Sequence, residues 1–393
     1  MTSTVSASAE ARLESLLKPY RDLSNAHMES IWTEFAAEHP EGSFPSTKTM
    51  RQNSRLFLAG KRYRFALALA GYRLLTGERP SQDLERAATW LEWYHLYTLF
   101  LDDIMDEDFR RRKFPSAWSS NARLYRGADG ARPATVFRTR RHRYGVSQAI
   151  LDALRIRSLA EWAIERAVGL HPSVRLELLA ELTTVDLILS DGQGLDIDFE
   201  RVADIPEDAY VRMSEAKTAR LYVGAAATAA IAARASSEDR AALETYARAL
   251  AVAFQDRDDL LGSGVVASQI GGSSEGDIRQ GKRTRLYVLA RGRLHGADRT
   301  AFLRAYGRGT KTTKRDVAVV RDLLRTHVLP AMEDRIREYQ KAARDALRRL
   351  PARDPDAAFW YSRMRSSMAG KTCVRRRSRT TATSRLVVFV PRP

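Results

Sequence analysis

Two aspartate clusters, far apart in the chain, are the residues with the clearest capacity for chemistry. They are Asp102, Asp103 and Asp106 in the first cluster and Asp258 and Asp259 in the second. Carboxylates at this density repel one another unless cations lie between them. Mg²⁺ prefers oxygen ligands and commonly binds through one or two carboxylates plus substrate phosphates. Because Asp102 and Asp106 are four residues apart, a helix would place them on one face, flanked by Asp103. The clusters therefore predict a site that holds a polyphosphate through metal ions.

The residues before Asp102 predict a long, mostly buried helix that ends at the first cluster. From Leu84 to Leu101 there is no Gly or Pro, and apolar residues recur at steps of three and four. Carboxylates at a helix C-terminus oppose the helix macrodipole, so this placement costs stability and favours a functional role. The alternative is a solvated acidic helix end, and the apolar Ile104 and Met105 between the acids argue against it.

The composition is that of a globular protein in a reducing compartment. Of the 393 residues, 44% are hydrophobic and 29% are charged, enough for one large domain or two ordinary ones. No apolar run approaches the ~18 residues that a membrane helix needs, and the N-terminus lacks a signal-peptide pattern. The single cysteine, Cys373, excludes an intramolecular disulfide. We therefore expect a cytoplasmic protein without a transmembrane segment.

The net charge of +17 is concentrated in two segments. Residues 113–143 carry +7 and residues 371–393 carry another +7, which leaves +3 for the rest of the chain. Neither segment contains a nucleic-acid-binding motif, and a run of like charge is usually a solvated face or tail. We expect no nucleic-acid partner.

Hydrophobic periodicity predicts helices through almost the whole chain and therefore an all-α bundle. The expected helices cover residues 7–38, 48–77, 81–110, 147–168, 173–191, 207–234, 237–262, 282–293, 298–306 and 313–348. Residues 113–143, with scattered Gly, Pro and Arg, do not fit this pattern. Neither do residues 370–393, which have no helical period. We expect both segments to be poorly ordered.

Several basic and polar motifs accompany the two clusters in a fixed order. They are Gly60-Lys61-Arg62-Tyr63-Arg64 upstream, Arg110-Arg111-Arg112 after the first cluster, Gly192-Gln193-Gly194-Leu195-Asp196 and Lys217-Thr218 between the clusters, Phe254-Gln255 before Asp258, and Gly281-Lys282 within residues 276–284. Lysine is a compact cation suited to phosphate oxygens, whereas arginine offers a bidentate fork. Each motif alone is a weak signal, but the ordered set is a strong one.

In this order the motifs resemble the trans-isoprenyl diphosphate synthase family, the head-to-tail polyprenyl synthetases, over residues 60–284. The family carries two aspartate-rich motifs of DDxxD type on facing helices, and residues 102–106 match the first without departure. The resemblance implies an isoprenoid synthase-type helical bundle around a central cavity. It also implies one synthase domain, residues 1–369, followed by a basic tail, residues 370–393.

The chain departs from the family pattern at several positions. Gly262 replaces the third acid of the second motif, an ending similar to that of actinobacterial geranylgeranyl diphosphate synthases. Phe65 stands in place of Pro, and Lys113 in place of the Gly that follows the arginine pair. Residues 113–141 look like an insertion. Ala153-Leu154 replaces an expected Gly-Asp pair.

The resemblance implies a Mg²⁺-dependent condensation of isopentenyl diphosphate with an allylic diphosphate, namely dimethylallyl, geranyl or farnesyl diphosphate. Asp102, Asp106 and Asp258 would bind the metal, as three Mg²⁺ ions or alternatively Mn²⁺, and Asp103 and Lys217 complete the catalytic set. The substrate-binding residues would be Lys61, Arg64, His95, Arg112, Arg111, Gln193, Thr218, Gln255 and Lys282. For His95, a hydrogen-bonded core role is an equally weighted alternative. The resemblance also implies a homodimer.

Product length is predicted from Tyr97 and Thr98, which lie about one turn before Asp102 and would form the floor of the product tunnel. One aromatic beside a small residue is typical of the geranylgeranyl type, and farnesyl or longer products are the alternatives. A class I terpene cyclase is a rival, which Asp258-Asp259 and the basic residues Lys61 and Arg64 disfavour. The insertion and the altered positions also leave room for a non-catalytic partner subunit.

Overall fold

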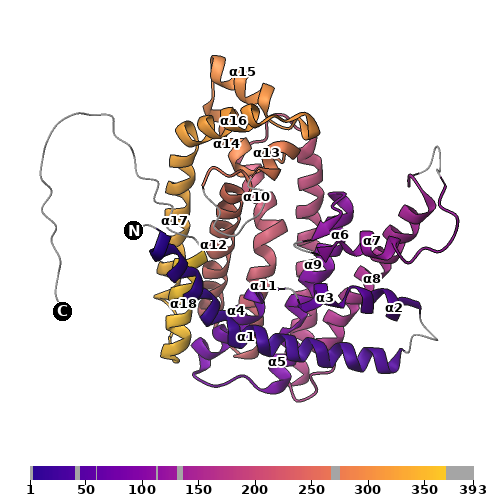
Figure 1. Cartoon of the computed structure of the whole chain (residues 1–393). Coiled ribbons are helices and arrows are strands. Elements are labelled where there is room, and N and C mark those ends of the chain that lie inside the picture. The colour runs from indigo at the N-terminus through magenta and orange to yellow at the C-terminus, as the bar shows by residue number, and fades with distance from the viewer. Residues whose placement is uncertain are drawn as a thin grey trace, which may run out of the picture.

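The computed structural model describes residues 3–39, 45–58, 60–111, 114–130, 136–266 and 275–368. Within these ranges the regular structure is helical apart from one two-stranded hairpin, so the predicted all-α fold class is confirmed. Long helices stand side by side, and a group of shorter helices, α13 to α16, covers one end of them (Figure 1). No helix in the described part is both long and apolar enough to cross a bilayer.

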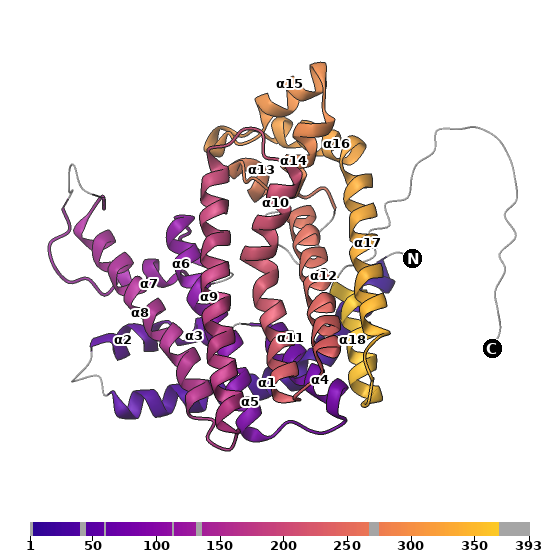
Figure 2. The same cartoon turned by 180° about the vertical axis from the view of Figure 1, so that it is seen from behind.

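Helix α11 is the centre of the bundle. It spans Arg220–Ala232 and packs against α4 (Tyr63–Thr76), α9 (Pro172–Glu200) and α12 (Ser237–Gly262). Every residue of α11 from Leu221 to Ile231 is buried. A helix without a polar face must be surrounded by other helices, and α11 lies between α9 and α12 in Figure 2. Its many alanines allow these neighbours to approach closely. The helices that carry the candidate motifs are thereby held around one axis.

The predicted helix over residues 81–110 is instead two helices followed by a hairpin. Its parts are α5 (Gln82–Ala88), α6 (Trp90–Met105), β1 (Arg110–Arg111) and β2 (Phe114–Pro115). The helix ends earlier than predicted because Glu107 adopts a left-handed conformation, with φ at 53°. The Asp108 amide then donates to the Asp103 carbonyl at 2.9 Å. This turn leads directly into the hairpin that carries Arg111.

The expectation of poor order is wrong for the described residues of the 113–143 segment. Helix α7 (Ala117–Ala122) packs against α8 (Arg140–Glu165), which begins seven residues earlier than predicted. Trp118 is buried, and its Nε1 donates to the Asp103 carbonyl at 3.1 Å. The segment therefore braces the end of α6 at the first aspartate cluster. Residues 112–113 and 131–135 lie outside the described ranges.

The rest of the chain surrounds this core. The remaining helices are α1 (Ser3–Glu38), α2 (Pro45–Gln52), α3 (Ser54–Leu58), α10 (Glu207–Ser214), η1 (Glu215–Ala219), α13 (Gly276–Gln280), α14 (Arg285–Arg293), α15 (Gly296–Ala305), η2 (Gly309–Lys311), α16 (Lys314–His327), α17 (Leu329–Leu347) and α18 (Pro355–Met368). Helix α18 was not predicted, yet it buries Tyr361, whose hydroxyl donates to the Leu67 carbonyl of α4 at 2.8 Å. The predicted helices 48–77 and 313–348 are each divided. The tail, residues 370–393, lies outside the described ranges.

Candidate active site

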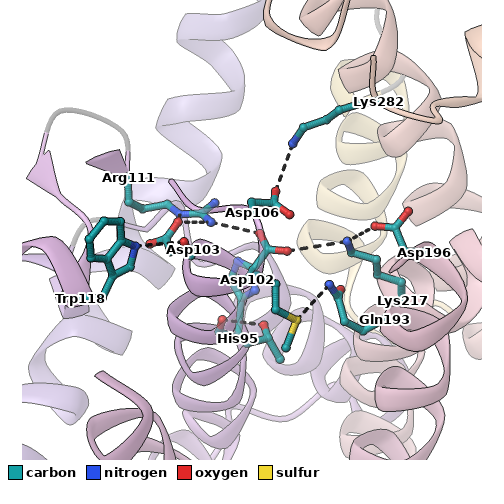
Figure 3. A network of polar contacts seen from close by, with 12 residues as sticks. His95, Asp102, Asp103, Asp106, Arg111, Trp118, Gln193, Asp196, Lys217 and Lys282 are labelled. Atoms are coloured by element: carbon teal, nitrogen blue, oxygen red, sulfur yellow. Dashed lines mark hydrogen bonds and ion pairs between the residues drawn. The ribbon is translucent and has the colours of Figure 1, made fainter. Parts of the chain in front are cut away.

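The first aspartate cluster receives cations from three separate elements. Asp102 accepts from Arg111 of β1 at 3.0 Å, and Lys217 Nζ lies 3.7 Å from its other oxygen. Lys282 Nζ lies 3.2 Å from Asp106 Oδ2. At the end of α6, Lys282 reaches Asp106 from above and Lys217 reaches Asp102 from the side (Figure 3). The structure thus brings together five residues that the sequence predicted as one site.

Asp103 differs from its two neighbours because its carboxylate is buried. The Arg111 Nε donates to it at 2.7 Å, so Arg111 spans Asp102 and Asp103. Burial raises the pKa of Asp103 to about 6, although the Arg111 guanidinium opposes that shift. The geometry gives Asp103 a part in fixing the orientation of Arg111, and its predicted catalytic role stays a prediction.

Lys217 is positioned by a local irregularity that periodicity did not predict. It lies in η1, one turn of π-helix between α10 and α11, a feature that often marks functional sites. A Cβ at Gly192 of α9 would lie only 2.4 Å from the Lys217 amide nitrogen, so the glycine permits this close approach. Burial lowers the pKa of Lys217, but Asp196 and Asp102 outweigh it and raise the pKa above its usual value. Lys217 is therefore a stable cation bonded to Asp196.

Lys282 is held at the first cluster by the turn that follows α13. Gly281 adopts φ of 74°, and a Cβ there would meet the Gly307 Cα at 2.8 Å. The Tyr306 hydroxyl donates to the Lys282 carbonyl at 2.6 Å. Burial opposes protonation of Lys282, but Asp106 raises its pKa above the usual value. This second lysine is also a stable cation.

The second aspartate cluster has one accessible carboxylate above a buried network. Asp259 is buried and accepts from the Gln255 amide at 2.9 Å, the Tyr210 hydroxyl at 3.2 Å and the Arg285 backbone at 3.0 Å. Sequence reasoning missed the pair beneath it, in which fully buried Arg285 lies 2.6 Å from fully buried Asp256. The one signal for that pair was an acid two positions before Asp258 on an apolar helix.

Asp258 carries the accessible carboxylate. Within the described residues it has no hydrogen-bond or ion-pair partner, in contrast to Asp102 and Asp106. Loss of hydration to the surrounding protein and the negative charge of neighbouring Asp259 raise the pKa of Asp258 to about 7. The positive charges of Arg257 and Lys61 act in the opposite direction. Such a carboxylate is poised to take up a cation.

The intervening motifs connect the elements between the clusters. The Thr218 hydroxyl of η1 donates to Gln255 of α12 at 3.3 Å, so Gln255 links η1 to Asp259. On α9, the Gln193 amide lies 3.4 Å from the Met105 sulfur at the end of α6 (Figure 3). Polar groups therefore occupy the space along α9, η1 and α12 where the sequence predicted substrate contacts.

The upstream basic residues have distinct surroundings. Lys61 is exposed, with Nζ 5.7 Å from the ring centroid of Tyr63. The Arg64 guanidinium lies over the buried ring of Tyr222 at 4.5 Å. Arg62 is different because it is buried and lies 3.5 Å from Glu92 of α6, which makes it a structural residue. Arg112 lies outside the described residues.

The predicted tunnel-floor residues and His95 lie on α6 below the first cluster. His95 is half-buried, and its carbonyl accepts from the Thr98 hydroxyl at 2.8 Å. Tyr97 is half-buried and packs edge-on against Tyr94, with ring centroids 5.3 Å apart. The Tyr94 hydroxyl in turn donates to Asp186 of α9 at 2.7 Å. Sequence reasoning missed Asp186, whose signal was a lone acid in an apolar stretch of that helix.

The donor set fits a magnesium–diphosphate unit better than a metal bound by protein alone. Across the described ranges, no three His, Cys, Asp or Glu side chains lie close enough together to hold a metal ion. The accessible donors are carboxylate oxygens, which Mg²⁺ prefers, with lysines beside them. Mg²⁺ usually keeps several waters and binds through one or two carboxylates plus substrate phosphates. The residues present fit that mode of binding.

The chain matches the polyprenyl synthetase family model over residues 47–323 and belongs to that family. Among its relatives, a geranylgeranyl diphosphate synthase of Saccharolobus solfataricus is 28% identical over 79% of this chain and 86% of its own length. A geranylfarnesyl diphosphate synthase of Aeropyrum pernix is 30% identical over 76% of this chain and 86% of its own. Membership confirms the resemblance seen in the motifs and makes this protein a trans-prenyltransferase.

Solved structures confirm the isoprenoid synthase-type fold. A geranylgeranyl pyrophosphate synthase from Corynebacterium glutamicum, complexed with isoprenyl diphosphate and magnesium, superimposes with a TM-score of 0.78. The alignment covers 90% of this chain and 99% of that one, at 23% identity. At this level of identity the similarity establishes the fold alone.

The raised pKa of Asp258 predicts a pH-dependent gain in stability on replacing it. The unfolded side chain ionises near pH 4 and the folded one near pH 7, so the native protein loses stability as pH rises through that window. Asp258→Asn cannot ionise. In metal-free buffer it should melt above the wild type at pH 8 and together with it at pH 4, by differential scanning calorimetry. Equal melting temperatures of the two proteins at pH 8 would contradict the raised pKa of Asp258.

Proposed function

We propose that the protein is a head-to-tail prenyltransferase that condenses isopentenyl diphosphate with an allylic diphosphate. The main support is a set of ion pairs. Arg111 and Lys217 lie beside Asp102, and Lys282 lies beside Asp106, although the three cations come from separate parts of the chain. Such a cluster has carboxylates for divalent cations and fixed positive charges for phosphate oxygens. Membership of the polyprenyl synthetase family supports the same reaction class.

The first step is loss of diphosphate from the allylic substrate. Asp102, Asp106 and Asp258 would hold the magnesium ions, predicted to number three, whose Lewis acidity offsets the charge on the departing group. Lys217 and Lys282 are both kept protonated by neighbouring carboxylates, and their ammonium groups would bind the phosphate oxygens of the departing diphosphate. Arg111 adds a fork of donors at the same end. The allylic carbon–oxygen bond breaks, and the electron pair leaves with diphosphate.

The second step joins the two substrates. Lys61, Arg64, His95 and Arg112 hold the diphosphate of isopentenyl diphosphate without metal. The double bond of that substrate attacks the allylic cation and forms the new carbon–carbon bond. A proton then leaves the adjacent carbon for the released diphosphate, which restores the double bond. Thr218 and Gln193 line the reacting region.

A cytoplasmic location, which is consistent with the single cysteine of the sequence, stays a prediction.

The direct test is product identification with wild-type protein, Mg²⁺, isopentenyl diphosphate and each allylic primer. Elongated prenyl diphosphate supports the proposal. A cyclic hydrocarbon would indicate a terpene cyclase, and no turnover would indicate a non-catalytic partner subunit. Either of the last two results would overturn the proposal.

Loss of a single metal-binding carboxylate should abolish most activity. Asp102→Asn and Asp258→Asn are each expected to lower kcat by about 100-fold or more, because they act on leaving-group charge in the transition state. The exposed Asp198→Asn on α9 is the matched control and should retain wild-type kcat. Circular dichroism checks that all three fold. Full activity of either cluster variant, or of wild type in excess EDTA, would refute the mechanism.

We propose geranylgeranyl diphosphate as the product, with farnesyl diphosphate as the runner-up. Tyr97 is buttressed by Tyr94, whose hydroxyl is fixed by Asp186, and this makes the ring a firm obstacle on α6. The Saccharolobus solfataricus relative is named for the same product.

Removing the Tyr97 ring should lengthen the product. Tyr97→Ala opens space for further isoprene units, whereas Tyr97→Phe keeps the ring and should leave chain length unchanged. Chromatography of the dephosphorylated products gives the answer. An unchanged length distribution in Tyr97→Ala would mean that another residue forms the floor.

We also propose that the enzyme is a homodimer formed through α8 and α9. Both helices expose large apolar side chains, which are Ile150, Leu151 and Leu154 on α8 and Leu187 and Ile188 on α9. Leu187 alone is 67% exposed. Exposed apolar groups gathered on neighbouring helices are typical of an interface between subunits.

A charge placed on this surface should separate the subunits. Leu187→Glu is expected to convert a dimeric wild type to a monomer by light scattering after size exclusion, because a buried carboxylate would be left unpaired. Leu303→Glu, at an exposed leucine of α15, should remain dimeric. A monomeric wild type, or a dimeric Leu187→Glu, would exclude this interface.

A further inference from the structure

Arg285, the first residue of α14, is fully buried and is bonded to α12 at two points. Its guanidinium Nε lies 2.6 Å from Oδ1 of Asp256, which is fully buried as well. Its backbone amide donates to Oδ2 of Asp259 at 3.0 Å. Asp256 and Asp259 are three positions apart, so they lie on one face of α12. The start of α14 is therefore fixed to the helix that carries Asp258.

Stability alone does not account for this buried ion pair. Taking two charges out of water is costly, and well-packed apolar side chains of similar volume often stabilise a protein as well or better. Buried apolar side chains of both helices, among them Leu260 and Leu286, already belong to one core cluster. The charge of Arg335, itself paired with Glu207, also acts on Asp256. What the ion pair adds to apolar packing is a defined register between α12 and α14.

This register bears on Lys282, which lies three residues before Arg285. The Lys282 ammonium reaches Asp106 of the first cluster at 3.2 Å. Three residues span at most about 11 Å, so the point at which Arg285 is fixed limits where Lys282 can lie. On the other side, the hydroxyl of Tyr306 donates to the Lys282 carbonyl at 2.6 Å. The segment 282–285 is thus held between Tyr306 and α12.

We propose that Arg285 is a positioning residue for prenyl transfer, which ties the segment 282–285 to α12 and so fixes the Lys282 ammonium relative to the Asp258 carboxylate. This inference rests on the proposed function, in which both groups serve the same diphosphate. Because they come from different elements, their separation has to be set before the substrate arrives. Arg285 is fully buried, so it acts only through its neighbours.

The double variant Asp256→Val/Arg285→Met separates positioning from stability, because it removes both buried charges and keeps a similar volume. It should melt within a few degrees of wild type. In calorimetric titration with Mg²⁺ and methylenebisphosphonate, a diphosphate analogue that resists hydrolysis, it should bind about tenfold more weakly. Arg73→Met/Asp354→Asn is the control, since it removes an ion pair at α4, and should bind like wild type. Wild-type affinity of the apolar double variant would overturn the proposal.

Adding Lys282→Ala to both backgrounds shows whether Arg285 acts through Lys282. In the wild type this change should weaken binding of the analogue about tenfold, whereas in the apolar double variant the further loss should be at most about threefold, because residues that act as one unit are not additive. Equal losses in the two backgrounds would overturn the proposal. If circular dichroism shows that the apolar double variant is unfolded, the nearly isosteric Asp256→Asn takes its place in the same comparison.

These titrations do not depend on turnover. If wild-type protein elongates prenyl diphosphates while Lys282→Ala costs the same in both backgrounds, this inference alone fails. If wild type elongates no primer, the proposed function fails, and unequal losses would still show that Arg285 positions Lys282.

Discussion

The repulsion among carboxylates is the constraint on which this architecture depends. Asp102 and Asp106 lie at the C-terminal end of α6, where the helix dipole already disfavours negative charge. Their position is tolerated because Arg111, Lys217 and Lys282 are brought to them from separate elements. At the second cluster Asp258 lacks such a partner among the described residues. The protein thus carries one acidic cluster whose accessible carboxylates are ion-paired and one whose accessible carboxylate forms no ion pair with the described residues, and a cation-bound diphosphate would complete both.

Several features of the fold position the cationic side chains beside the first aspartate cluster. Trp118 anchors the hairpin segment to the backbone of Asp103, next to Arg111. Gly192 lets the π-helical turn approach α9 closely enough for Lys217 to bond with Asp196. These are local departures from regular helix, and each occurs where a cation must be placed. Strain and irregularity of this kind concentrate at functional sites because regular packing alone cannot aim a side chain.

The sequence predicted most of the helices, because they depend on local pattern, and the structure brings several of the predicted site residues together. The spacing of Asp102 and Asp106 was sufficient to place them on one face. Periodicity could not predict the π-helical turn at Lys217, since one extra residue in a turn leaves little trace in an alanine-rich helix. Nor could it reveal that the Asp277 carboxylate lies against Gly262, because contacts between separate helices leave no local pattern in the sequence. The sequence did not predict that residues 114–122 are ordered. Their order depends on packing of α7, which carries Trp118, against α8, and such a contact has no local signal in the sequence.

Titration of inorganic diphosphate into wild-type protein, with and without Mg²⁺, tests the central claim most directly. If the acidic clusters are completed by a cation-bound diphosphate, each ligand should strengthen the other, and affinity for diphosphate should rise at least about tenfold when Mg²⁺ is present. By the same linkage, diphosphate should raise the affinity for Mg²⁺ equally. Diphosphate binding of the same strength with Mg²⁺ and with EDTA would contradict the account.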